Sequence, residues 1–221
     1  MLRLVALAGA CLTLAVSGAA REAVLTVPRR VTRASAEAFA RNHRAWLGER
    51  LAALPNGAPF IAGGEIMLRG RVHGIAAGGG RAIVLDETGD GPLILVPGPP
   101  ARLHARLLAF CRRTARADLE AAVALHAGRL GVTPASLSLR DPKSRWGSCS
   151  GRGRLSFSWR LVLAPPSVLD YVAAHEVAHL REMNHGPGFW RLVAETCPDY
   201  QASRLWLRRN GAELHRYGAD G

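Results

Sequence analysis

Three histidines and one glutamate lie within a short stretch of this chain at a spacing that suits metal chemistry. The stretch runs from His175 to His185 and begins with the pattern H-E-x-x-H. On an α-helix, residues four apart lie one turn apart on the same face, so His175 and His179 can bind one metal ion. Glu176 stands beside them, and in this pattern the glutamate serves as general base for a metal-bound water. The pattern therefore predicts a zinc hydrolase site.

Zinc is the metal that such ligands favour. Two or three neutral imidazoles leave one coordination position open, and a water bound there ionises near neutral pH. With 8 His and 17 acidic residues in 221 positions, H-[DE]-x-x-H is expected only about 0.02 times per chain by chance. Two histidines that merely share a helix face are therefore the weaker explanation. A regulatory or inactive metal site is a further alternative.

The residues before the motif predict the helix that carries it. Prolines 165–166 end the preceding segment, and Ser167 with Asp170 matches an S-x-x-D capping box. The apolar stripe opposite the ligands consists of Leu169, Ala173, Val177 and Leu180. We therefore expect the ligands on a buried, rigid helix.

The third ligand has two candidates. Asn184 tolerates a left-handed backbone and is expected to end the helix, so that the chain doubles back and His185 approaches the motif. Gly186 gives the backbone further freedom on the other side of His185. In the gluzincin class, a glutamate on the following helix completes the site, and Glu195 is the candidate for that role.

The spacing of the three histidines is also that of the metzincin proteases. In that class a glycine stands where this chain has Glu182, and a methionine turn follows the motif. No methionine follows Met183, so the sequence excludes the metzincin class.

Three segments around the motif carry a family resemblance. They read S-R-W-G-S-C-S at 144–150, L-S-F-S-W-R-L-V-L-A-P-P at 155–166, and H-E-V-A-H-L-R-E-M-N-H-G-P-G-F-W at 175–190. These segments resemble the YgjP-like metallopeptidase family, which is related to the SprT-like proteases. The resemblance covers about residues 136–217, and the first hundred residues resemble, more weakly, the family's variable β-rich front end.

This resemblance implies a zinc-dependent peptidase. It assigns the metal ligands to His175, His179 and His185 and the general base to Glu176. A peptide or protein substrate follows from it, although the physiological substrates of YgjP-like members are poorly defined.

Composition gives a globular chain with a strong positive charge. The chain is 48% hydrophobic, and its 29 Lys and Arg residues outnumber 17 Asp and Glu residues for a net charge of +12. Lys143 is the only lysine, so this arginine richness reflects either codon bias or a functional basic surface. The four cysteines, which show no C-x-x-C spacing, indicate thiols of a reducing compartment. They are Cys11, Cys111, Cys149 and Cys197.

A long helix is predicted from about residue 101 to residue 130, with Gly131 at its end. Its inner stripe contains Leu103, Leu107, Cys111, Ala115, Leu119, Ala122 and His126. His126 continues this stripe and is expected in the core rather than at the metal. The other side carries Arg102, Arg106, Arg112, Arg113 and Arg116. A nucleic-acid surface is one interpretation of these arginines, and a solvated helix face is the other.

The fold class that these patterns predict is α+β. A small β-rich N-terminal region with one helix, expected over residues 35–53, precedes a zincin-like catalytic region. The catalytic region consists of a long helix, a β-hairpin, the H-E-x-x-H helix and C-terminal helices. Pro97 to Pro100 is the best linker, so we expect domains at residues 1–99 and 100–221.

Strands are predicted on both sides of that linker. Short apolar runs between glycine-rich turns indicate strands at 66–68, 82–85 and 93–96. Beyond the linker, 136–140 alternates as a strand, and 146–150 is expected to pair with 155–163. The strand at 155–163 is a candidate edge along which an extended peptide could add.

The N-terminus allows two interpretations. An apolar run from Leu4 to Val16, followed by small residues, imitates a secretory signal peptide, but it is too short to span a bilayer as a helix. Residues 11–16 and 23–28 also match two strands of a hairpin, which we favour. We therefore expect a cytoplasmic protein without a membrane span, and a secreted or periplasmic one if residues 1–20 act as a signal peptide.

Taken as a whole, the sequence predicts a zinc-dependent metallopeptidase. The alternative from another class is a nucleic-acid-associated protein. It would be either a SprT-like protease that acts on DNA-bound proteins or a binding module whose metal is structural. A structural site would have a fourth protein ligand, whereas a catalytic one keeps a position open.

Overall fold

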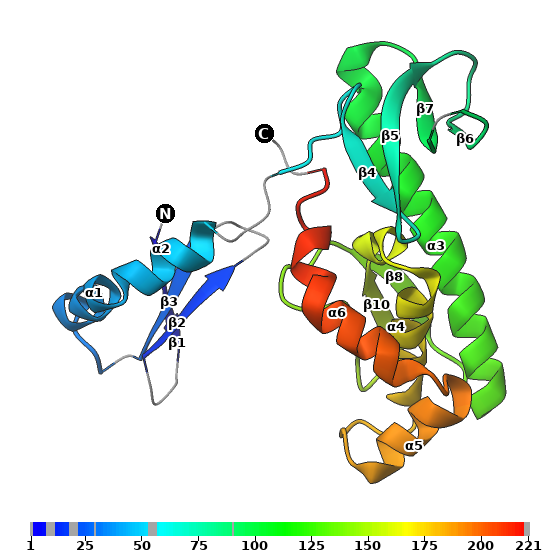
Figure 1. Cartoon of the computed structure of the whole chain (residues 1–221). Coiled ribbons are helices and arrows are strands. Elements are labelled where there is room, and N and C mark those ends of the chain that lie inside the picture. Colours follow the sequence, from blue (N-terminus) through cyan, green and yellow to red (C-terminus); the bar gives the residue numbers. More distant parts are fainter. Residues whose placement is uncertain are drawn as a thin grey trace. The chain divides into compact units, whose positions relative to one another are not determined.

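Blocks of strand and blocks of helix follow one another along the chain, which gives the α+β fold that the sequence predicts. The computed structural model describes residues 2–7, 12–17, 22–28, 30–52, 57–89 and 91–218. The chain divides into two compact units between residues 56 and 57. Figure 1 labels the elements of both.

The first unit is a three-stranded sheet with two short helices. Its elements are β1 (Leu2–Leu7), β2 (Thr13–Ser17), β3 (Glu22–Pro28), α1 (Arg33–Asn42) and α2 (Arg44–Ala52). Strand β3 lies in the middle, antiparallel to β2 and parallel to β1. The pair β2–β3 confirms the predicted hairpin, although Cys11 and the connection at 18–21 lie outside the described residues.

The helix expected over 35–53 is two helices, because the chain turns at His43. Thr32, and not a residue inside the predicted helix, caps α1 by accepting a hydrogen bond from the Ser35 backbone N–H. The small core of this unit forms where Leu25 of β3 meets Ala36 and Ala40 of α1.

The second unit contains two sheets and most of the helices. Its elements are β4 (Glu65–Leu68), β5 (Arg71–Gly78), β6 (Val84–Asp86), β7 (Leu93–Pro97), the 3-10 helix η1 (Pro100–Arg102), α3 (Leu103–Leu130), β8 (Ser136–Arg140), β9 (Gly147–Cys149), β10 (Arg154–Ser158), the 3-10 helix η2 (Trp159–Leu163), α4 (Pro166–Ala178), α5 (Pro187–Thr196) and α6 (Tyr200–Leu214). The strand orders are β4-β5-β7-β6 and β8-β10-β9.

Helix α3 runs along this unit (Figure 1). Its buried residues belong to two hydrophobic cores. Its N-terminal half, from Leu103 to Ala115, packs with the β4–β7 sheet and η2. Its C-terminal half, from Leu119 to Leu130, packs with β10 and α4. Every residue of the predicted stripe is buried, and Gly131 ends the helix in the left-handed conformation. One long helix thus fixes the sheet and α4 relative to each other.

The predicted linker lies inside this unit rather than at its border. Strands β4, β5 and β7 share a core with the first half of α3, so residues 57–99 and 100–218 form one compact body. The boundary of the two compact units therefore lies between residues 56 and 57, whereas the sequence predicts a domain boundary between residues 99 and 100. The boundary at 99 and 100 stays a prediction.

The hairpin of β4 and β5 turns through Arg69 and Gly70, which both have positive φ. Two such residues are what a type I′ turn needs. At this tip the backbone N–H groups of Arg69 and Gly70 donate to the carbonyls of Val162 and Leu163. Arg69 also forms a two-point ion pair with Asp118 of α3. The tip therefore ties η2, which leads into α4, to the long helix.

The prediction of one strand over 155–163 is wrong in its second half. The strand β10 ends at Ser158, and the next five residues form the buried 3-10 helix η2. The Ser158 side chain starts this helix by accepting a hydrogen bond from the Arg160 N–H. Strand β10 is also central, parallel to β8 and antiparallel to β9. It therefore has no free edge, and the edge next to α4 belongs to β9.

The capping box predicted for α4 is also absent. Pro165 is the N-cap, Pro166 occupies the first helical position, and no side chain caps the helix. Asp170 instead accepts a hydrogen bond at 2.9 Å from Nε2 of His126, which is fully buried on α3. This pair links the core of α3 to a partly exposed carboxylate on α4, and His126 lies in the core as predicted, outside the cluster of three histidines.

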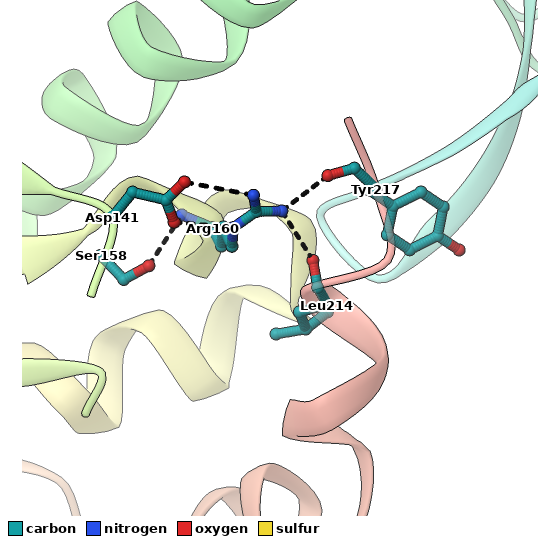
Figure 2. Close-up of polar contacts among 5 residues, drawn as sticks. All are labelled: Asp141, Ser158, Arg160, Leu214 and Tyr217. Carbon is teal, nitrogen blue, oxygen red and sulfur yellow. Dashed lines mark hydrogen bonds and ion pairs between the residues drawn. The ribbon is translucent and has the colours of Figure 1, made fainter. Parts of the chain in front are cut away.

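A buried arginine joins three distant parts of the second unit (Figure 2). The guanidinium of Arg160 forms a two-point ion pair with Asp141 and donates to the carbonyls of Leu214 and Tyr217. The segment around Tyr217 also pairs as a short parallel bridge with Ala58. Arg160 thus holds the end of α6 against η2 and the loop after β8.

None of the described helices combines the length with the hydropathy that crossing a membrane requires.

We expect Arg160→Met to lower the free energy of unfolding by about 3 kcal/mol, because the carbonyls of Leu214 and Tyr217 and the carboxylate of Asp141 lose their shared, buried donor. Urea unfolding of the full chain measures this loss. Arg71→Met is the matched control, since Arg71 pairs with Glu87 on the surface and exposed pairs contribute about 0–1 kcal/mol. Equal losses in the two variants would contradict the role assigned to Arg160.

Candidate active site

Helix α4 carries the first residues of the site. It is apolar on nearly all sides, so it packs into the core and is held in a fixed position. It is buried against α3, α5 and α6, with Ala173, Ala174 and Val177 fully covered. The residues of chemical interest lie in its last turn, where His175 and Glu176 are followed by His179 at the C-cap. A helix packed on several sides cannot rotate, so these side chains are fixed in direction.

The three histidines lie together, as the sequence predicts. One ring nitrogen from each of His175, His179 and His185 lies within 4.8 Å of the others. Nε2 of His175 and Nε2 of His185 are 3.1 Å apart. Among the described residues, no other cluster of His, Cys, Asp or Glu has a comparable arrangement.

The donor set fits a metal ion such as zinc. Imidazole nitrogens at about 2.0–2.1 Å from one tetrahedral ion would lie about 3.4 Å apart, close to the observed separation of two of them. The Nδ1–H group of His179 donates a hydrogen bond of 2.9 Å to the backbone carbonyl of Glu182. This bond fixes the ring so that Nε2 is left for a metal, as outer-sphere partners of ligating histidines usually do.

An aromatic side chain packs against all three imidazole rings. The buried ring of Phe189, on α5, has its centroid 4.5–4.8 Å from the centroids of all three imidazoles. Burial, with the nearby His179 and His185, lowers the pKa of His175 to about 3. Burial also lowers the pKa of His179. Both rings are therefore neutral at physiological pH, which is the form that binds a metal.

Glu176 lies under the edge strand of the sheet. Its side chain is 5% exposed, and burial raises its pKa to about 7, while the charge of Arg145 acts in the opposite direction. The covering residue is Gly147 at the start of β9, where a Cβ atom would stand 2.5 Å from Oε1 of Glu176. Only glycine allows strand and helix to approach so closely.

The route from α4 to His185 differs from the predicted one. The helix ends at Ala178, not at Asn184, and Asn184 does not have a positive φ. Tight turns follow, in which the N–H groups of Leu180 and Glu182 donate to carbonyls of the last helical turn. Gly186 then serves as N-cap of α5 in an extended conformation. The chain thus reverses through several turns, and the start of α5 sets the position of His185.

Glu195 lies in the last turn of α5, is exposed, and is not part of the histidine cluster. The two candidates for third ligand therefore differ in position, with His185 close to the other rings.

Two residues of this site have no signal in periodicity or spacing. Gly147 looks like any strand glycine, and its contact with Glu176 links positions 29 residues apart. Phe189 contacts the histidines only because α5 folds back against them, which the sequence does not show. The family resemblance includes the G-P-G-F-W run that contains Phe189 but implies no role for its ring.

One comparison with known proteins identifies the family of the chain. The model of the YgjP-like metallopeptidase domain matches residues 12–210. The crystal structure of the metallopeptidase zymogen of Pyrococcus abyssi abylysin is similar at 22% identity and a TM-score of 0.38, covering 46% of this chain and 99% of that one. No curated protein matches the chain.

Gly147→Ala is expected to lower the free energy of unfolding by about 1–3 kcal/mol, because the added methyl overpacks the contact with Glu176. Urea unfolding measures the change. Gly151→Ala in the neighbouring turn is the control, since a Cβ atom there meets no atom within 4 Å. If Gly147→Ala were as stable as this control, the close approach would not be a constraint on the fold.

Proposed function

Because the chain belongs to the YgjP-like metallopeptidase family, we propose that it hydrolyses peptide bonds with a zinc ion held by His175, His179 and His185. The observation that carries this proposal is the cluster of three ring nitrogens within 4.8 Å beside a buried glutamate. Three imidazoles leave a fourth position for water or substrate, which is the ligand count of a catalytic rather than a structural site.

Glu176 is the proposed proton carrier. A bound zinc ion supplies Lewis-acid activation of the attacking water and of the scissile carbonyl. The Glu176 carboxylate accepts a proton from the water and passes it to the nitrogen of the leaving amine. Its raised pKa suits both steps, since a group that titrates near neutral pH exchanges protons readily in both directions. The ring of Phe189 covers the ligand rings on the side of α5 and shields that side from water.

The substrate is proposed to add along β9. In the antiparallel pair, Ser158 donates to the carbonyl of Trp146 and Ser150 donates to the carbonyl of Arg154, so the even-numbered residues face β10. By alternation, the backbone groups of Gly147 and Cys149 point to the free edge. An extended peptide that pairs there would run beside α4 and present a peptide bond to the site.

Two contacts weigh against the arginines of α3 as a nucleic-acid surface. Arg106 donates to the carbonyl of Pro97, and Arg116 pairs with Glu120 on the same helix. A peptide substrate is therefore the function we propose. The cytoplasmic location stays a prediction, which the free thiols of Cys111, Cys149 and Cys197 support.

Glu176→Gln is expected to keep zinc and to lose peptide hydrolysis by at least about a hundredfold, because glutamine is nearly isosteric but cannot accept the proton. Zinc content and cleavage of a quenched fluorescent peptide are measured on the same sample. Full activity in this variant would mean that another group is the base.

His185→Ala is expected to yield a largely metal-free protein, whereas Glu195→Ala keeps zinc. Losing a ligand removes a bond to the metal, while losing a group outside the first sphere costs about 10- to 100-fold in affinity or activity. Titration with zinc against a competing chelator ranks the two variants. The reverse order would place the site in the glutamate class.

A further inference from the structure

The β8-β10-β9 sheet has one apolar face and one polar face. Leu137, Leu139, Leu155 and Phe157 point into the cores. Residues that alternate with them line an open cavity of about 880 Å³ on the other face, among them Ser138, Ser148 and Ser156. Ser156 lies directly opposite Ser138 and Ser148 on the two neighbouring strands. A row of hydroxyl groups therefore crosses the sheet.

Four arginines surround this row of serines. They are Arg140, Arg145, Arg152 and Arg154, and we call them with the serines the arginine face. All four are exposed. No salt bridge or side-chain hydrogen bond of these four guanidinium groups occurs within the described part of the chain, and no acidic residue lines the cavity. The arginine face thus carries four positive charges, of which only that of Arg145 acts on a carboxylate of the described residues, that of Glu176.

The arginine face adjoins the edge that we propose for the substrate. Arg145 stands two residues before Gly147, and Ser148 lies between the two residues whose backbone groups point to the free edge. Side chains of an extended peptide alternate between the two faces of the sheet it joins. Every second side chain of a peptide on β9 would face α4, and those in between would turn toward the arginines.

We propose that the arginine face selects substrates with acidic side chains at alternating positions. This inference rests on the proposed function, since it needs a peptide paired with β9. Guanidinium groups bind carboxylates through two parallel hydrogen bonds. The hydroxyls of Ser148 and Ser156 can donate to the same oxygens, whereas Ser138 already donates to the carbonyl of Leu155. The residues that face α4 remain free to vary, so the selection acts on one side of the substrate only.

The features of this face favour a peptide over a nucleic acid. A strand edge offers alternating N–H and C=O groups, which match a peptide backbone. Proteins that hold single strands of nucleic acid stack bases on aromatic rings, and no aromatic residue lines the cavity.

The test measures binding to the zinc-loaded, full-length Glu176→Gln chain, so that no probe is cut. Three fluorescein-labelled probes are compared by anisotropy. They are a decapeptide with Glu at every second position, the same peptide with Gln at those positions, and a single-stranded DNA decamer. We expect the Glu peptide to bind about tenfold more tightly than the Gln peptide, since each exposed ion pair changes affinity by about 1.5- to 5-fold.

Adding Arg140→Gln and Arg154→Gln should remove most of this preference. The control adds Arg112→Gln and Arg113→Gln on α3, which remove the same charge from exposed positions away from the sheet, and should keep the preference. Equal binding of the two peptides would overturn the inference. Tighter binding of the DNA decamer than of the Glu peptide, lost in the same sheet variant, would overturn it in favour of a nucleic-acid surface.

Cleavage by the unmodified chain separates this inference from the proposed function. If the chain cuts both peptides at the same rate, the peptidase proposal stands and the acidic selection fails. If it cuts neither peptide but the Glu peptide still binds more tightly through the sheet arginines, the selection stands and the peptidase proposal fails.

Discussion

The close approach of β9 to α4 at Gly147 is the constraint on which the site depends. Because residue 147 has no side chain, the backbone of the edge strand lies directly on the Glu176 carboxylate. This contact buries the carboxylate, raises its pKa and places the edge strand against the helix that carries His175. A single missing Cβ atom therefore brings together the proposed proton carrier and the proposed substrate track, which elements far apart in sequence supply.

The elements around α4 leave it little freedom. Helix α3 covers it along one side, and the His126–Asp170 hydrogen bond links the two helices. The tip of the β4–β5 hairpin holds η2, which leads into α4, and Arg160 holds the end of α6 against η2. Contacts from several elements thus fix the turn that carries the ligands. This suits a metal site, whose ring nitrogens must stay within a few tenths of an ångström of their bonding positions.

The sequence predicts the elements of this fold better than their ends. The 3.6-residue stripe of α3 and the Gly131 cap are confirmed, because a long period and a left-handed residue are local signals. The sequence pattern does not predict strand β5, because Gly74 and two alanines blur its alternation. The division of 155–163 into strand and 3-10 helix depends on tertiary hydrogen bonds that no local pattern contains. Spacing alone predicts His175 and His179, and the family resemblance assigns His185, whereas Gly147 and Phe189 act through contacts that exist only after folding.

The bridge between Ala58 and Tyr217 has a consequence for biosynthesis. Contacts between residues so distant in sequence close a very large loop, and such contacts form late and slowly. On the ribosome, Ala58 emerges long before Tyr217. Arg160 also emerges before Leu214 and Tyr217, whose carbonyls accept its hydrogen bonds. The histidine helix is therefore synthesised well before the segment that closes the unit around it. The nascent chain completes its second unit only after α6 and the segment around Tyr217 have left the exit tunnel.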